Sequence, residues 1–345
     1  MSERILKYTE AIREATGQLL EKDADVFVIG LGVTYKDGAD GTTGGLAAKY
    51  PKRVFDVPVS ESSFTGMSVG AALSGLRPII HHGRVEFSML AMDSIITQAA
   101  KWNYMFGGGN PVPIVLRIAV GRQWGNGPQH TQALYGLFGG TPGLKVVIPS
   151  TPRMAKGLLI AASKDPNPVV FLESRWLYKV KQDVPTEMFS ETLDKARVVK
   201  KGKDVTVVAY GDGFLAALEA CDLVGKDASI ELIDIVSINP IDYDTIVKSV
   251  AKTGRLICVD TTPAAFSIGS EIIAAVAKAL PLQNKPIALT TPSVPCPTST
   301  ALTECYYPTK VDIANAILRA MNKSDIKRVL TFEELHLASG LTLHE

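Results

Sequence analysis

Short apolar runs alternate along this chain with longer amphipathic stretches, and this alternation restricts its fold more than any other feature. In the first half, the apolar runs predict strands at residues 26–29, 54–55, 79–82, 113–118, 145–148 and 169–172. The intervening stretches, such as residues 64–73, 88–104 and 152–163, have helical spacing. Because a helix usually joins two parallel strands, this alternation predicts an α/β fold with a doubly wound, mainly parallel sheet.

The alternation starts again after a polar, charged stretch in the middle of the chain. Apolar runs predict strands at residues 205–209, 230–233 and 256–259, and helices are predicted at residues 214–224, 243–251, 269–279 and 311–321. A chain of 345 residues is long enough for two domains with separate cores. We therefore expect a first α/β domain at residues 1–178, a linker at 179–203, a second α/β domain at 204–322 and a C-terminal extension at 323–345.

The charge balance limits the classes of partner. The chain has 36 basic and 35 acidic residues and a formal net charge of +1, so we expect no general attraction to nucleic acid or to an anionic membrane. No apolar run approaches membrane-spanning length, and residues 1–18 are charged and amphipathic rather than a secretory signal. These features predict a cytoplasmic protein. Its four cysteines lack paired metal-ligand spacing, and we expect free thiols.

Residues 56–83 contain the first candidate for chemistry. Glu61 follows the apolar run of residues 54–55 and precedes a helix rich in glycine and alanine, so its carboxylate should lie just outside the carboxyl end of a strand. Open α/β sheets bind their ligands at that edge. A lone glutamate in this position is otherwise a solvated loop residue or a partner in a helix cap.

His130 is the second candidate. It lies in a glycine-rich loop at residues 119–132, where Gly-Asn-Gly-Pro sets a turn shortly before the imidazole. A lone histidine in a loop is more often a surface or packing residue. An imidazole in an active site can instead transfer protons near neutral pH.

Several short motifs resemble a known family, in the same order along the chain. They include DVPVSE at residues 56–61, GLRP at 75–78, FSM at 87–89, QAAK at 98–101, PVPIV at 111–115, QHTQ at 129–132 and PGLKVV at 142–147. The chain resembles the beta subunit of the thiamine-diphosphate-dependent decarboxylase component of 2-oxo acid dehydrogenase complexes over about residues 5–320. Transketolases share its domains more loosely. The resemblance implies a pyrimidine-binding α/β domain followed by a transketolase C-terminal-like domain.

The resemblance also implies roles for individual residues. Glu61 hydrogen-bonds the aminopyrimidine ring of thiamine diphosphate and favours the tautomer that activates the cofactor by proximity. Phe87 packs against the pyrimidine, and Val59 and Gly83 complete the cofactor-binding set. His130 acts as a catalytic and substrate-binding residue over the cofactor.

Two features depart from the family pattern. Residues 81–84 read HHGR, where the family usually has an acidic residue and then a bulky apolar one, so Gly83 lacks a packing contact and Arg84 brings a permanent cation. Arg84 either forms a structural salt bridge, for example with Glu86, or binds an anionic group of the substrate. The extension at residues 323–345 is also unusual for the family, which leaves docking onto an acyltransferase core open.

The magnesium ligands are expected on another chain. Gly211-Asp212-Gly213 and the later Asn239 loosely resemble the metal-diphosphate motif of thiamine enzymes, but the usual paired asparagine is absent and Pro240 follows at once. The resemblance therefore implies an alpha-type subunit that carries the diphosphate-binding domain and the Mg²⁺ ligands. It further implies an α2β2 heterotetramer, with a lipoyl acyltransferase as another candidate partner.

A structural potassium ion is implied as well. In the family, backbone carbonyls and an aspartate hold this ion at a turn between helix and strand. The matching positions here are Ile114, Ala162, Ser163, Asp165 and Asn167. Without the resemblance, residues 164–168 are simply a rigid turn.

These observations favour one function and leave two others open. The leading prediction is the beta subunit of a 2-oxo acid dehydrogenase (decarboxylating) component that passes an acyl group to lipoamide. The alternative is one half of a split transketolase-like enzyme, which would transfer a two-carbon ketol unit to an aldehyde. A third interpretation, a non-catalytic scaffold subunit, is disfavoured by Glu61 and His130.

Overall fold

The chain divides into two compact units, one of which takes a segment from within the other's sequence. The computed structural model describes residues 4–122, 125–282, 284–303, 305–331, 334–335 and 341–343. The first unit contains Met1–Val120, Leu137–Leu193 and Ser339–Glu345, and the second contains Gly121–Gly136 and Asp194–Ala338. The segment that carries His130 therefore belongs to the second unit.

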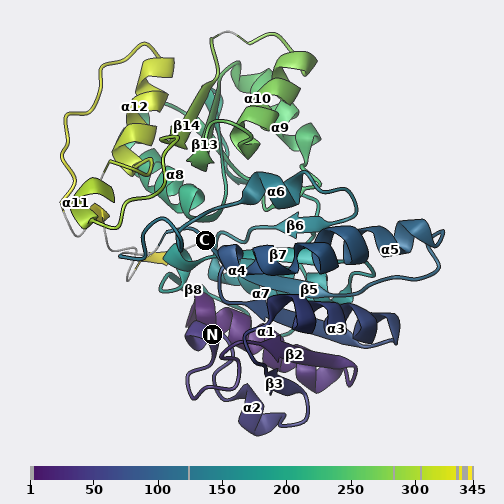
Figure 1. Cartoon of the computed structure of the whole chain (residues 1–345). Helices are drawn as coiled ribbons and strands as arrows, with labels where there is room; N and C mark the ends of the chain where they lie inside the picture. The colour runs from purple at the N-terminus through teal and green to yellow at the C-terminus, as the bar shows by residue number, and fades with distance from the viewer. Residues whose placement is uncertain are drawn as a thin grey trace. The chain divides into compact units, whose positions relative to one another are not determined.

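A parallel sheet forms the centre of the first unit (Figure 1). Its strands lie in the order β6-β7-β5-β4-β2-β3, and every neighbouring pair is parallel. This arrangement confirms the predicted α/β fold. The strands are β2 (Val26–Gly30), β3 (Val54–Asp56), β4 (Arg77–His82), β5 (Val115–Val120), β6 (Lys145–Val147) and β7 (Val169–Ser174).

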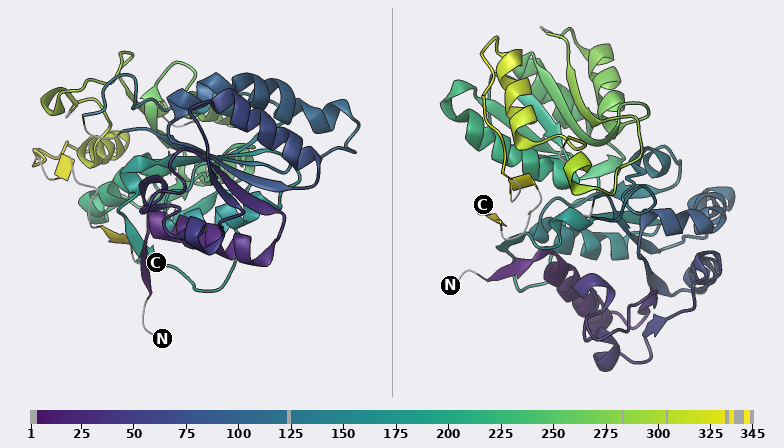
Figure 2. Two further views of the ribbon diagram at one scale, coloured as in Figure 1. Left: turned by 60° about the horizontal axis from the view of Figure 1, so that its bottom comes forward. Right: turned by 60° about the vertical axis from the view of Figure 1, so that its left-hand side comes forward.

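Helices cover both faces of this sheet. Figure 2 shows α3 and α5 on one face and α1 and α7 on the other, and α1 packs directly against α7. The helical elements are α1 (Tyr8–Lys22), η1 (Ala39–Gly41), α2 (Leu46–Lys49), α3 (Glu61–Leu73), α4 (Val85–Ser88), η2 (Met89–Ala91), η3 (Asp93–Ala99), α5 (Ala100–Met105), α6 (Tyr135–Gly139), α7 (Pro152–Lys164) and η4 (Arg175–Leu177). The predicted single helix at residues 88–104 is interrupted, because η3 is a π-helix with a wider turn.

A small second sheet joins distant parts of the first unit. Strand β1 (Ile5–Lys7) pairs antiparallel with β8 (Lys181–Asp183), and β15 (Thr342–Leu343) pairs parallel with β8. The last described residues of the predicted extension therefore belong to the first unit.

The second unit has its own parallel sheet. Its strands lie in the order β14-β13-β10-β11-β9, with only β9 antiparallel to its neighbour. The elements are β9 (Arg197–Lys200), β10 (Val205–Ala209), α8 (Gly211–Val224), η5 (Gly225–Asp227), β11 (Ile230–Asp234), β12 (Ser237–Asn239), α9 (Tyr243–Thr253), β13 (Leu256–Pro263), α10 (Ile268–Ala279), β14 (Ile287–Thr291), α11 (Thr300–Thr303) and α12 (Lys310–Ala320). Strand β14 was missing from the sequence prediction.

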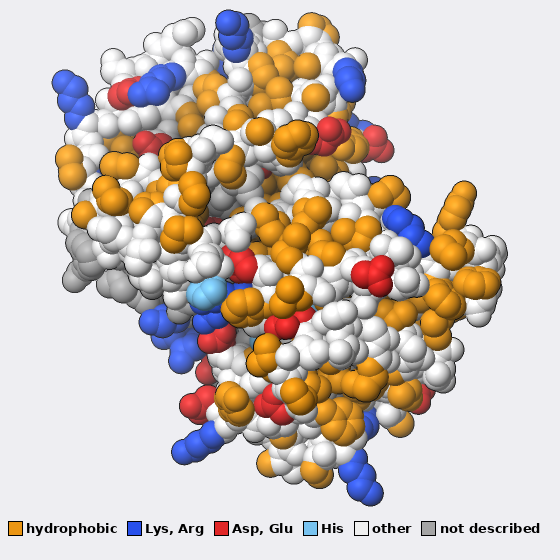
Figure 3. Space-filling view, in the orientation of Figure 1, with side chains coloured by type: hydrophobic (Ala, Val, Ile, Leu, Met, Phe, Trp, Pro, Cys, Tyr) orange, Lys and Arg blue, Asp and Glu red, His pale blue; other side chains and the backbone are white. Residues whose placement is uncertain are grey.

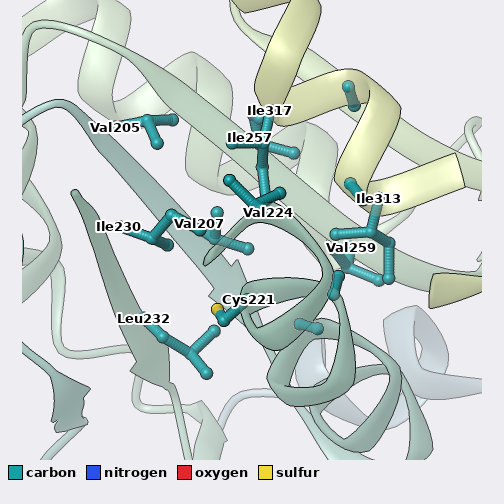
Figure 4. Close-up of a cluster of buried hydrophobic side chains, with 14 of the residues drawn as sticks. Val205, Val207, Cys221, Val224, Ile230, Leu232, Ile257, Val259, Ile313 and Ile317 are labelled. Atoms are coloured by element: carbon teal, nitrogen blue, oxygen red, sulfur yellow. The ribbon is translucent and has the colours of Figure 1, made fainter. Parts of the chain in front are cut away.

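Helices α8 and α12 bury the core of the second unit against one face of its sheet. Figure 4 shows Val207 and Ile257 from the sheet facing Val224 of α8 and Ile317 of α12, and all of these side chains are buried. Cys221 lies in the same core as a free thiol. Burial raises the pKa of this thiol to about 11, so it is protonated and unreactive at neutral pH.

Charged side chains of both signs are interspersed on one face of the molecule. On the face shown in Figure 3, basic and acidic groups lie among apolar ones, in agreement with the net charge of +1. Within the described residues, no helix combines the length and the apolar character needed to cross a membrane.

Candidate functional site

Glu61 is buried at the start of α3, and its charge has no partner among the described residues. Only 4% of the residue is exposed, and no described side chain or backbone group donates a hydrogen bond to its carboxylate or pairs with it. The positive end of the helix dipole favours an anion here. The described residues thus leave the Glu61 carboxylate available to a hydrogen-bond donor.

The position of Glu61 depends on the loop that follows β3. Asp56 ends this strand, and its Oδ1 accepts hydrogen bonds from the backbone N–H of Gly32 at 3.1 Å and of Val57 at 3.0 Å. Its Oδ2 accepts a third, from the Thr34 hydroxyl at 2.9 Å. These bonds hold the loops after β2 and β3 together at the carboxyl edge of the sheet. Val59, predicted to contact the cofactor, is 79% exposed in the second of these loops.

His82 attaches α3 to the end of β4. Its Nε2 lies 3.2 Å from the Thr65 hydroxyl, and its ring centroid lies 5.1 Å from that of Phe64. Burial lowers the pKa of His82 to about 3, so the ring is neutral and acts as a packing and hydrogen-bonding group. The sequence analysis did not assign this role to His82. It is a positioning contact for the helix that Glu61 begins.

Gly83, Arg84 and Phe87 follow β4 at the same edge of the sheet, and all three are half-buried. A side chain added at Gly83 would meet no atom within 4 Å, so this glycine leaves open space. Burial lowers the pKa of Arg84 and nearby Arg175 lowers it further, while the carboxylates of Glu86 and Asp40 oppose both effects. The structural and the substrate-binding interpretations of Arg84 therefore both remain predictions.

An ion pair with no solvent exposure lies within the central sheet. Arg117 of β5 donates to Glu173 at the end of β7 through Nε at 2.5 Å and Nη2 at 3.0 Å, and both side chains are 0% exposed. The Tyr178 hydroxyl donates to the same carboxylate at 3.2 Å. Burial lowers the pKa of Arg117, but the charge and the hydrogen bonds of Glu173 raise it above its ordinary value.

This pair was not predicted from the sequence, although the sequence contains a signal for it. Arg117 interrupts an otherwise apolar predicted strand, and Glu173 directly follows another. Charges in buried strands are nearly always paired, which predicts a partner for each. His81, which stands beside Arg117 in the register of β4 and β5, is also buried. Burial and the charge of Arg117 lower the pKa of His81 well below its ordinary value.

His130 lies in a closed loop of the second unit. The backbone N–H of Gly121 donates to the Gln132 carbonyl oxygen at 2.9 Å, and the His130 N–H donates to Gly127 at 3.3 Å. The imidazole Nδ1 lies 2.5 Å from the Gln129 carbonyl oxygen, which assigns the proton of a neutral ring to Nδ1. That tautomer leaves Nε2 as the basic nitrogen.

The five predicted potassium positions lie around the end of α7. Asp165 pairs with the Lys145 ammonium, and its Oδ1 accepts a hydrogen bond from the Asn167 N–H at 2.9 Å. The backbone carbonyls at three of these positions accept hydrogen bonds: Ile114 from Val169 N–H at 3.0 Å, Ala162 from Asp165 N–H at 3.2 Å and Ser163 from the Arg77 guanidinium at 3.0 Å.

The Gly-Asp-Gly motif forms the turn from β10 into α8, as the sequence analysis favoured. Asp212 is buried in the first turn of this helix, where its Oδ2 pairs with Arg122 at 3.3 Å. In the part of the chain that the structure describes, no group of three His, Cys, Asp or Glu side chains is placed to hold a metal ion.

The sequence of this chain matches two known protein-family domains. Residues 5–181 match the transketolase pyrimidine-binding domain, and residues 194–313 match the transketolase C-terminal domain. The chain belongs to the transketolase family. The predicted order of a pyrimidine-binding domain and a transketolase C-terminal domain is thereby confirmed.

Relatives within the transketolase family confirm the more specific resemblance. The chain is 38% identical over 331 residues to the beta subunit of an acetoin:2,6-dichlorophenolindophenol oxidoreductase from Cupriavidus necator, covering 92% of this chain and 98% of the relative. It is 37% identical over 330 residues to the mitochondrial pyruvate dehydrogenase E1 beta subunit of Saccharomyces cerevisiae. This match covers 93% of this chain and 90% of the relative.

A solved structure shows the same transketolase fold at lower identity. It is a split-gene transketolase described as an inactive beta4 tetramer, with a TM-score of 0.76 and 21% sequence identity. The match covers 92% of this chain and 98% of that structure. Identity at this level supports the fold alone.

Proposed function

We propose that this chain is the beta subunit of a thiamine-diphosphate-dependent 2-oxo acid dehydrogenase (decarboxylating) component. The observation that carries the proposal is Glu61, a carboxylate with 4% exposure and no partner among the described residues. It lies at the carboxyl edge of a parallel sheet, where such folds bind ligands. The names of the relatives, a pyruvate dehydrogenase E1 beta subunit and an acetoin oxidoreductase beta subunit, support the same reaction class.

The residues around Glu61 fit an aminopyrimidine. When bound, thiamine diphosphate supplies the electron sink that decarboxylation of a 2-oxo acid requires. Glu61 would share a proton with a ring nitrogen of the pyrimidine, which would give the buried carboxylate its missing partner. Phe87 offers an aromatic ring in α4, which follows β4, Gly83 leaves open space between these two elements, and Val59 is exposed in the loop after β3.

His130 is proposed to act on the substrate. With the proton on Nδ1 facing the Gln129 carbonyl, the basic Nε2 is the atom that would accept a proton. When protonated, the ring would donate a hydrogen bond to the substrate carboxylate or the acyl group.

The proposed partner is an alpha-type subunit that carries the diphosphate-binding domain and the Mg²⁺ ligands, in an α2β2 heterotetramer. Two features of α3 support a contact with another chain. A side chain added at Gly70 would meet no atom within 4 Å, and Met67 is 58% exposed on the same helix. None of the described residues therefore requires so small a residue at position 70. A lipoyl acyltransferase is the further partner that a dehydrogenase component would serve.

This division of the cofactor site predicts weak binding by the chain alone. In isothermal calorimetry, the purified chain should bind thiamine diphosphate with Kd weaker than about 1 mM, equivalent to about −4 kcal/mol. Addition of Mg²⁺ should change this little, because the described residues contain no metal cluster. Tight binding of thiamine diphosphate that requires Mg²⁺ and is lost in Asp212→Asn would contradict a cofactor site divided between two chains. It would assign the Mg²⁺ ligand to the Gly-Asp-Gly motif.

We also propose a monovalent cation at the end of α7, held by Ile114, Ala162, Ser163, Asp165 and Asn167. The set offers only oxygen atoms, which a hard cation prefers. Each predicted carbonyl accepts one hydrogen bond in the structure, and a carbonyl oxygen has two lone pairs. One lone pair on each thus remains for an ion.

Potassium should therefore stabilise the folded chain. In potassium chloride, the melting temperature should exceed that in tetramethylammonium chloride of equal ionic strength by about 3 °C, as expected when the ion concentration is well above its Kd. The increase should vanish in Asp165→Asn. Equal melting temperatures of the parent chain in both salts would argue against the ion.

A split transketolase-like enzyme is the second candidate function. Arg84 and Gly83 favour it, because a half-buried guanidinium suits an anionic sugar and Gly83 leaves space. The relatives at 37–38% identity support the dehydrogenase instead.

Arg84→Ala separates these two functions. In the chain combined with its alpha-type partner, the variant should reduce 2,6-dichlorophenolindophenol with pyruvate at nearly the parental rate. For a ketol transferase, the same variant should mainly raise the KM for an anionic sugar. A contact that is equally strong in the ground state and in the transition state affects substrate binding more than turnover. Robust ketol transfer without decarboxylation of 2-oxo acids would reject the proposed function.

A further inference from the structure

The segment that carries His130 is attached at both ends to the first turn of α8. At its beginning, Arg122 pairs with Asp212, and the two side chains are 14% and 2% exposed. At its end, the Tyr135 ring lies edge-on to the ring of Tyr210, with 5.4 Å between centroids. Tyr210 is the N-cap residue of α8 and lies two positions before Asp212. One helix start therefore holds both ends of the segment.

Two glycines of the segment lie very close to other residues of the second unit. Gly127 has a φ of +66°, and a Cβ there would lie 2.4 Å from the Thr298 hydroxyl oxygen. A Cβ at Gly136 would lie 2.5 Å from the carbonyl oxygen of Phe266. Both distances are shorter than a Cβ contact allows, so a larger residue at either position would have to displace its neighbour within the second unit. His130 lies between them.

The Arg122–Asp212 pair is the polar part of this attachment. The Arg122 guanidinium also lies 4.8 Å from the centroid of the Tyr307 ring, whose residue is 6% exposed. The guanidinium therefore lies between a carboxylate and an aromatic face, both of which attract a cation. Replacing a buried ion pair by apolar residues is often neutral for stability, so such a pair is weak evidence for a purely stabilising role.

We infer that Asp212 is a positioning residue, which sets the place of His130 through Arg122. The inference rests on the role proposed for His130 above, and it explains why an aspartate occupies the Gly-Asp-Gly turn of a chain with no metal cluster among its described residues. Displacement of a catalytic group by about 1 Å can cost a hundredfold in rate.

The first test measures backbone hydrogen exchange in the isolated chain. Asp212→Asn keeps the shape of the side chain and removes its charge, so exchange at residues 125–132 should rise at least about tenfold relative to the parent. The matched control is Asp222→Asn on the same helix, which removes a surface ion pair with Lys200. It should leave exchange at residues 125–132 unchanged. Unchanged exchange in Asp212→Asn would overturn the inference, whatever its effect on activity.

The second test uses the chain combined with its alpha-type partner, thiamine diphosphate and Mg²⁺, with pyruvate and 2,6-dichlorophenolindophenol. Asp212→Asn should lower kcat about tenfold to a hundredfold, with a smaller change in KM. In a His130→Gln background it should cause no further loss, because it acts through His130. Arg122→Lys, which keeps a cation, should retain more activity than Arg122→Met.

These outcomes separate the inference from the proposed function. Full activity of His130→Gln would reject the catalytic role of His130 itself. His130→Gln could instead lose activity while Asp212→Asn causes the same additional loss in the parent and in the His130→Gln background. That result would overturn the positioning role of Asp212 and leave the catalytic role of His130 intact. A melting temperature of Asp212→Asn close to that of Asp222→Asn would show that the loss of activity is not general unfolding.

Discussion

Glu61→Gln is expected to lower turnover by at least about a hundredfold while the chain still folds and assembles, as for the loss of a positioned acid–base group. The substitution keeps the size and shape of the side chain. It removes the negative charge that would hold a proton shared with the aminopyrimidine. Steady-state reduction of 2,6-dichlorophenolindophenol with pyruvate, by the chain combined with its alpha-type partner, measures the effect.

The melting temperature of Glu61→Gln is expected to behave differently from its turnover. Because the Glu61 carboxylate is buried and has no partner among the described residues, its replacement by a neutral amide should not lower the melting temperature. Most substitutions at buried sites destabilise, so this result would mark Glu61 as a residue retained for chemistry. Asp93→Asn, an exposed carboxylate in the first turn of η3, is the matched control for activity. Near-parental turnover of Glu61→Gln would reject the proposed role.

Glu173→Ala is expected to destabilise the first unit by about 3–5 kcal/mol, because it leaves the Arg117 guanidinium buried without its carboxylate. A loss of this size should lower the melting temperature by roughly 10 °C. Differential scanning calorimetry or guanidinium unfolding of the isolated chain measures it, since no partner or cofactor is needed.

The double variant Arg117→Met with Glu173→Leu tests the cause of this effect. Removing both charges leaves no buried ion, so the double variant should be markedly more stable than Glu173→Ala. Asp325→Asn, which breaks the exposed pair with Arg319, should leave the unfolding transition unchanged. A Glu173→Ala chain that unfolds at the parental temperature would show that the Arg117 charge finds another partner.

The sequence alone determined the fold class and the place of Glu61. Both are local properties, because the period of apolar residues reports the type of each element. A carboxylate that follows a predicted parallel strand must lie near the carboxyl edge of the sheet. The order of the family motifs added the two domains, which the family matches bear out. Strand β14 was missed because its residues are mostly only half-buried and it lacks a clear apolar pattern.

Only the tertiary structure decided which charges meet. Arg117 and Glu173 are far apart in sequence, and they pair because β7 lies next to β5 while β6 passes to its outer side. The glycine-rich segment around His130 has no apolar period from which its neighbours could be predicted. Its attachment to α8 depends on Arg122 and Asp212, which are brought together by packing. Local patterns specify elements, whereas strand order and loop attachment depend on the free energy of packing the whole unit, which no short stretch of sequence contains.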